Sequence, residues 1–139
     1  MMRAAKFFAK LTGQVCIVAV ALVLMYCSGK RNQDLAEWEQ LENFRVVMER
    51  AFVPLRDSSS VASVEKNIEQ IAEAGEKLAG GDVPEKVNNA AMRAKLEKLK
   101  SDTRSLAREI ADGTEDDVIG TEFYAVHDLF LEIDAAWRR

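Results

Sequence analysis

The chain has 139 residues, of which 48% are hydrophobic and 30% charged, so its composition is that of a folded protein rather than a disordered one. Residues 1–29 contain three basic residues and no acidic ones, whereas residues 30–139 contain 16 basic and 23 acidic residues and carry a net charge of −7. Because phosphate contacts require clustered lysine and arginine, an acidic body is a poor nucleic-acid binder, and we expect no nucleic-acid partner.

Residues 1–29 have the layout of an export signal. Three basic residues precede an uncharged, apolar run from residue 15 to residue 27, which is the order of a basic n-region and an apolar h-region. Both cysteines, Cys16 and Cys27, lie in this segment. Residues 30–139 therefore have neither a disulfide framework nor a cysteine-based metal site.

Three fates of this segment are open. A signal peptidase would cut after Gly29, where Cys27 and Gly29 supply the small residues at −3 and −1. A lipoprotein peptidase would cut before Cys27 and lipidate it, with Leu24 at −3, although Tyr26 stands where a small residue is usual. Without cleavage, the 19 uncharged residues 11–29 are long enough to span a bilayer. In each case the basic end stays in the cytoplasm and residues 30–139 are extracytoplasmic; we favour membrane attachment over full release.

Helical periodicity continues through the rest of the chain. Apolar residues recur at spacings of three and four, which predicts four helices with one apolar face each, at approximately 33–56, 60–79, 84–111 and 115–138. The predicted inward positions are Leu35, Trp38, Leu41, Phe44, Met48, Ala51 and Leu55; Val61, Val64, Ile68, Ile71, Gly75 and Leu78; Met92, Leu96, Leu99, Thr103, Leu106 and Ile110; and Ile119, Phe123, Val126, Phe130, Ile133 and Trp137.

Local signals set the ends of the first two helices. Pro54 lacks the backbone N–H of a helix interior, so the first helix should kink or end near it. The serines of residues 57–60 can cap the next helix. Gly80 and Gly81 should stop the second helix through left-handed backbone angles.

The third and fourth helices have their own start signals. We expect Asp82 to cap the third helix, with Pro84 in its first turn and Gly113 at its end. Thr114 should cap the fourth, with Asp117 three residues later as an approximate capping box. Four helices joined by short turns predict an all-α, antiparallel, up-down-up-down four-helix bundle over residues 30–139.

Two features of this bundle carry further predictions. Gly75 falls on an inward stripe, which indicates close helix approach, with a ligand space as the alternative. Trp38 and Trp137 lie at the start of the first helix and the end of the fourth, so they should meet at one end as a core plug; a lipid-interface contact is the alternative.

His127 is the chain's single histidine. Phe123 and Phe130 flank it on the same helix face, so it should lie partly covered at the edge of the apolar stripe. Counting residues from the turn at Gly113 puts it level with Phe44, Ile71 and Leu99 on the other three helices. We interpret it first as a structural histidine.

The four-helix arrangement, the body length and the export signal resemble the soluble b-type cytochromes of the periplasm and their cytochrome c-prime relatives. In that group a methionine on the first helix and a histidine on the last, or the histidine of a CxxCH motif, hold the haem. CxxCH is absent here, so the resemblance implies non-covalent haem b, with Met48 and His127 as axial ligands and electron transfer as the alternative function.

Metal binding is a further alternative. A bundle metal site usually includes a Glu-x-x-His pair, but Tyr124 precedes His127 by three residues and Leu131 follows it by four. A metal would need carboxylates such as Asp128 or Glu132, and a periplasmic metal-binding or metal-sensing role rests on them.

We expect no catalytic residues, because one histidine and scattered carboxylates supply no positioned acid–base pair. The sequence thus predicts a non-enzymatic, membrane-tethered, extracytoplasmic bundle that binds another macromolecule or a small ligand, without a cofactor in this leading interpretation.

Overall fold

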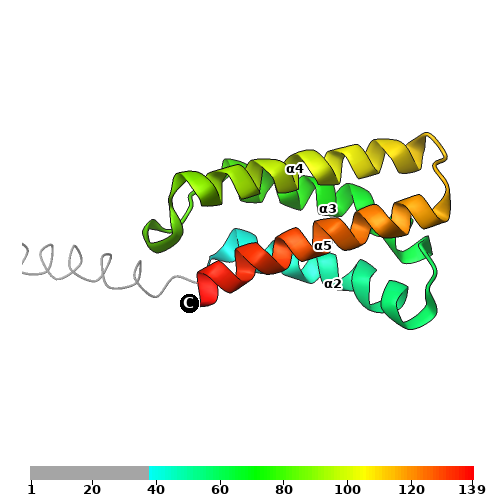
Figure 1. Ribbon diagram of the computed structural model, residues 1–139, viewed down its shortest axis with the longest axis horizontal. Coiled ribbons are helices and arrows are strands. Elements are labelled where there is room, and N and C mark those ends of the chain that lie inside the picture. Colours follow the sequence, from blue (N-terminus) through cyan, green and yellow to red (C-terminus); the bar gives the residue numbers. More distant parts are fainter. Residues whose placement is uncertain (1–37) are drawn as a thin grey trace, which may run out of the picture. The chain divides into compact units, whose positions relative to one another are not determined.

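A computed structural model describes residues 38–139; residues 1–37, including the predicted helix start at 33, lie outside the described part. The described residues form four helices packed together and one short 3-10 turn, with no strand among them (Figure 1). The elements are α2 (Glu39–Ser58), α3 (Ala62–Gly80), η1 (Glu85–Val87), α4 (Ala90–Ala111) and α5 (Asp116–Arg138). The predicted all-helical class is confirmed for this part of the chain.

One hydrophobic core joins the four helices. The predicted inward positions from Trp38 onward are buried, apart from Ile110 and Trp137, which are half-buried at the two ends. Removing these side chains from water stabilises the fold by roughly 25 cal/mol for each Å² of apolar surface. The three-and-four spacing therefore identified the core correctly.

The third helix begins later than predicted. Residues Glu85–Val87 form η1, and α4 starts only at Ala90. Its cap is Asn89, whose Oδ1 accepts a hydrogen bond from the backbone N–H of Met92 at 2.9 Å, so the expected cap at Asp82 is wrong. Asn89 caps the helix because its backbone is extended and its side-chain amide oxygen reaches a backbone N–H that has no partner within the helix.

Other boundaries also differ in detail. α2 continues through Pro54 to Ser58, and Ser59 then adopts a left-handed φ of 55°. Gly81 ends α3 in an extended conformation rather than the predicted left-handed one, whereas Gly113 after α4 has the left-handed φ of 80°. The N-cap of α5 is Glu115 rather than Thr114, and it makes no side-chain capping bond.

α3 and α4 approach closely at Gly75. A Cβ atom at this position would lie 3.0 Å from the Thr103 hydroxyl and 3.8 Å from the Lys100 Cα. Thr103 is fully buried, and its hydroxyl donates to the Lys100 carbonyl at 3.0 Å. The predicted close approach is confirmed, because the space that glycine leaves is filled by the neighbouring helix.

α2 and α5 are joined by large side chains instead. The Phe44 and Phe130 rings lie 5.4 Å apart, centroid to centroid, and Trp38 meets Trp137 edge to face at 5.9 Å. An ion pair between Arg45 and the Asp134 carboxylate bridges the same two helices. Aromatic rings thus define this seam, and His127 lies on it.

Candidate functional site

His127 packs against an aromatic ring of the facing helix. Its imidazole lies parallel to the Phe52 ring of α2, with 3.7 Å between the ring centroids and 3° between the planes. Tyr124, also on α5, contacts the same Phe52 ring edge to face, with 5.8 Å between the ring centroids. Only 15% of the His127 side chain is exposed, as predicted for a partly covered histidine.

Burial sets the charge of this imidazole. Loss of hydration lowers the pKa of His127 below its ordinary value, and the negative charge of Asp128 raises it by a smaller amount. The His127 Nδ1 and Asp128 Oδ1 atoms are 4.0 Å apart, too far for a hydrogen bond. His127 is therefore neutral at pH 7, the form that can also act as a metal ligand.

His127 faces a different part of α2 from the one predicted by counting residues from the turn at Gly113. It contacts Phe52, whereas Phe44 contacts Phe130, so the prediction that His127 lies level with Phe44 is wrong by up to two helical turns. A residue count from a turn ignores the offset with which two helices dock. Met48 lies between Phe44 and Phe52 on α2 and is therefore within about one turn of His127.

Met48 and His127 thus lie at similar heights along the helix axes, but buried side chains fill the interior between the helices there. Met48, Phe44 and Phe123 are fully buried, and Phe130 is 3% exposed. Because protein interiors are close-packed, a haem coordinated by both residues would have to displace at least one buried ring. The side chains do not fit a haem without that displacement, and haem binding stays a prediction that haemin titration tests.

Metal binding at His127 also stays a prediction. In residues 38–139, no three side chains of the His, Cys, Asp and Glu types come together to hold one. Asp128 lies next to His127 but is largely exposed, and Glu132 forms an ion pair with Lys95 at 2.7 Å.

The two tryptophans close one end of the bundle. Trp38 is 2% exposed, and Trp137 is half-buried beside it, so the predicted core plug is confirmed. The Lys86 ammonium of η1 lies 3.8 Å from the centroid of the Trp137 ring, in cation–π contact. The indole N–H of Trp38 is buried and has no hydrogen-bond partner within the described residues.

Within the described residues, the grooves between neighbouring helices include three shallow ones. Two of them, between α3 and α4 and between α2 and α3, are lined by mixed charges. The third, of about 260 Å3, lies between α4 and α5 and is lined by Asp102, Ser105, Glu109, Glu122, Ala125 and Val126. Neither Met48 nor His127 lines any of these three grooves.

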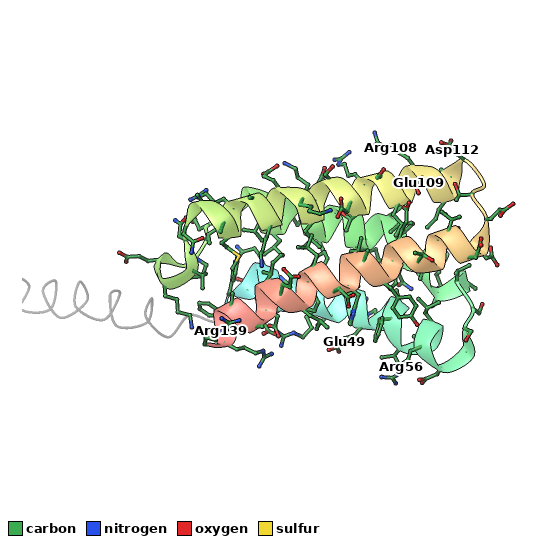
Figure 2. The ribbon with its side chains drawn as sticks, viewed as in Figure 1. Glu49, Arg56, Arg108, Glu109, Asp112 and Arg139 are labelled. Carbon is green, nitrogen blue, oxygen red and sulfur yellow. The ribbon has the colours of Figure 1, made fainter. Side chains whose placement is uncertain are left out.

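The α4–α5 groove is acidic and has no basic side chain in its lining. A hydrogen bond with Glu109 is the main cause that raises the pKa of Glu122, and burial and the negative charges of Glu109 and Asp102 add to it. Figure 2 shows Glu109 near the end of α4, with Arg108 and Asp112 beside it. The negative charges of Glu109 and Glu122 therefore oppose each other at this groove, whereas Asp102 is paired with Lys98 at 2.6 Å.

The outer face of α5 was missed by sequence reasoning. Tyr124 and Leu131 are exposed by 43% and 46%, large values for apolar side chains, and they lie seven residues apart on the same helix face, although the Tyr124 ring also contacts Phe52. The predicted apolar stripe of this helix included the buried face alone. One signal could have revealed it: residues 109–137 contain nine acidic residues and no lysine or arginine.

The predicted lipidation site at Cys27 and the predicted span at residues 11–29 lie outside the described residues. Within residues 38–139, none of the helices has the length and apolarity needed to cross a bilayer.

Comparisons with protein-family models, with curated proteins and with solved structures found no match for this chain.

Proposed function

We propose that this chain is a non-catalytic, extracytoplasmic helical bundle, tethered to a membrane by its first 29 residues, that works by binding another macromolecule. The basic, then apolar, order of residues 1–29 supports the tether and the direction of export. The acidic charge of residues 30–139 supports a protein rather than a nucleic acid as the macromolecule bound.

We propose also that the four helices run up-down-up-down. Three short connections join them, at residues 59–61, 81–89 and 112–115. The Ser63 hydroxyl at the start of α3 donates to the Ala51 carbonyl near the end of α2 at 2.7 Å, and Trp38 at the start of α2 meets Trp137 at the end of α5. Both contacts join the end of one helix to the start of another, which is what antiparallel neighbours require.

The observation that carries the binding role is the contrast between a filled interior and the few large apolar side chains that are exposed on α2 and α5. Val46 and Val53 on α2, like Tyr124 and Leu131 on α5, are more than 40% exposed and lie seven residues apart on one helix face. Single exposed apolar residues are normal on protein surfaces, whereas aligned pairs on a helix face form a contact surface. The binding function is therefore assigned to the surface and not to an internal site.

Haem binding through Met48 and His127 is the competing function, and one titration separates the two. Haemin is added to the full chain in detergent, and the visible spectrum is recorded for the wild type and for His127→Ala. The binding-module proposal predicts the same free-haemin spectrum for both proteins. A sharp Soret shift that His127→Ala abolishes would establish a haem protein instead.

The tether and its topology are tested together. A cysteine is placed at exposed Lys66 on α3 in a Cys16→Ser, Cys27→Ser background and exposed to a membrane-impermeant maleimide in right-side-out membrane vesicles. Labelling of the variant without lysis is the expected result, and the wild-type protein, which keeps Cys27, should be retained in the membrane fraction. Labelling only after lysis would refute an extracytoplasmic body, and release of the wild-type protein into the soluble fraction would refute the tether. Because the background removes Cys27, the mass of the wild-type mature N-terminus shows whether a peptidase has cut.

A further inference from the structure

α5 carries a second stripe opposite its buried one. Asp117, Thr121, Tyr124, Asp128, Leu131 and Ala135 follow one another at spacings of four and three, and all six are exposed. Two large apolar side chains, Tyr124 and Leu131, alternate along this stripe with the carboxylates of Asp117 and Asp128. The inner, apolar face of α5 is buried in the core. Its outer face, which carries both apolar and acidic side chains, is free to contact a partner.

The charge of this surface is one-sided. α5 has six acidic residues and one basic residue, whereas the neighbouring α4 has three acidic and six basic residues. Among the described residues, Glu132 pairs with Lys95, and Asp134 pairs with Arg45 and Arg138. No lysine or arginine in the same part of the chain forms an ion pair with Asp117 or Asp128.

The α4–α5 groove extends this surface on one side. Three carboxylates, those of Asp102, Glu109 and Glu122, line it, together with the apolar Ala125 and Val126. Asp102 is paired with Lys98 at 2.6 Å, whereas Glu109 and Glu122 form no ion pair with another described residue. A lysine or arginine side chain entering the groove would find an apolar wall for its methylene stem and carboxylates for its charged head. α5 thus offers apolar contacts on its outer stripe and cation contacts at its flank.

We propose that the outer face of α5 docks a basic amphipathic helix of a protein partner. The partner's apolar residues pack on Tyr124 and Leu131, and its lysines or arginines lie against Asp117, Asp128 and the carboxylates of the α4–α5 groove. This inference rests on the proposed binding function and names the partner's chemistry. A helix laid along the 23 residues of α5 would follow it for about 34 Å at 1.5 Å for each residue.

The same charges disfavour the other occupants. An anionic membrane surface would repel the acidic stripe. A second copy of the chain, pairing α5 with α5, would set carboxylates against carboxylates. The basic residues 1–29 of the same chain have the right charge, but the proposed topology leaves their charged end on the other side of the membrane. A basic helix from another extracytoplasmic protein meets both the apolar and the electrostatic requirement.

Site-specific photo-crosslinking of the full chain in its native membrane tests the proposal. A photoreactive amino acid is placed at Leu131 on α5, at Val46 on α2 and at Lys66 on α3, each exposed. The expected result is one protein adduct from Leu131, whose crosslinked peptide, identified by mass spectrometry, is an amphipathic segment with an excess of lysine and arginine.

A matched pair of charge reversals sharpens the test. Asp128→Lys changes the outer stripe of α5, and Glu69→Lys makes the same charge change on exposed α3. Because like charges at a contact oppose binding, Asp128→Lys should lower the adduct yield from Leu131 at least about tenfold, whereas Glu69→Lys should leave it within about twofold. Unchanged helical circular dichroism in both variants confirms that the fold is intact.

The outcomes separate this inference from the proposed function. An adduct from Val46 or Lys66 but none from Leu131 would overturn the inference and keep a binding module. An adduct of Leu131 with lipid, with a second copy or with residues 1–29, or with an acidic segment, would also overturn it, as would equal yields in the two reversal variants. No adduct from any of the three positions would overturn both.

Discussion

The seam between α3 and α4 and the seam between α2 and α5 close the same core in different ways. Between α3 and α4, Gly75 lets the neighbouring backbone approach so closely that an added Cβ would lie 3.0 Å from the Thr103 hydroxyl. Between α2 and α5, aromatic rings from both helices fill the space. We therefore expect a larger side chain to destabilise the fold at the first seam and a smaller side chain to destabilise it at the second.

Removing a ring from the α2–α5 seam should have the largest effect. Phe44→Ala deletes a fully buried ring in contact with Phe130, and a change of this kind lowers the free energy of unfolding by about 3–5 kcal/mol. Chemical denaturation of the full chain in detergent, followed by tryptophan fluorescence, measures it. Val46→Ala, at an exposed position on the same helix, should cost less than about 0.5 kcal/mol. Equal losses would mean that the seam is not packed as described.

Adding volume to the α3–α4 seam should come next. Gly75→Leu forces a side chain against Thr103 and the Lys100 backbone, and overpacking of this kind costs about 1–3 kcal/mol. The control is Gly80→Ala at the end of α3, where an added Cβ meets nothing within 4 Å. A Gly75→Leu protein as stable as the wild type would show that α3 and α4 are further apart.

The end of the α2–α5 seam should respond more weakly. Lys86→Met removes the ammonium above the Trp137 ring while keeping a flexible, apolar chain, and an exposed cation–π contact contributes about 0.5–1 kcal/mol. Lys66→Met on exposed α3 serves as the matched control and should change the unfolding free energy by less. Equal effects of the two substitutions would rule out a specific contribution from the ring contact.

The smallest effect is the pH dependence that His127 introduces. Its folded-state pKa lies below the unfolded value of about 6.5, so the unfolded state binds the proton more readily. The stability contribution is therefore complete above pH 6.5 and is lost as the pH falls through the folded-state pKa. His127→Phe should remove this dependence while keeping a ring against Phe52. Melting temperatures of both proteins between pH 5 and 8 measure the difference; parallel curves would contradict the assigned burial.

Periodicity predicted the core but not the details that local chemistry decides. The three-and-four spacing found the buried faces, including Gly75 and Thr103, because burial follows helix geometry. The start of α4 was misplaced because Asn89, rather than Asp82, supplies the capping oxygen. A choice between two nearby capping residues depends on backbone angles that the spacing of apolar residues does not contain.

The candidate site was predictable in part. The partial burial of His127 followed from its flanking phenylalanines, whereas its contact with Phe52 depends on how far α2 and α5 are offset along their axes. The outer stripe of α5 was not predicted, although residues 109–137 lack lysine and arginine. The inward positions of this helix were predicted correctly, so the opposite face and its charge bias could have been read from the sequence as well.

Because His127 is the chain's single histidine, its ring signals report directly on the α2–α5 seam. NMR of the full chain in detergent, with labelled histidine and phenylalanine, should give strong nuclear Overhauser effects between the His127 and Phe52 rings and a His127 pKa below 6.5. Phe52→Leu should abolish the ring contact and move the pKa toward the ordinary value. A histidine with the shifts and pKa of an unfolded peptide, unaffected by Phe52→Leu, would contradict the packing from which the surface assignment follows.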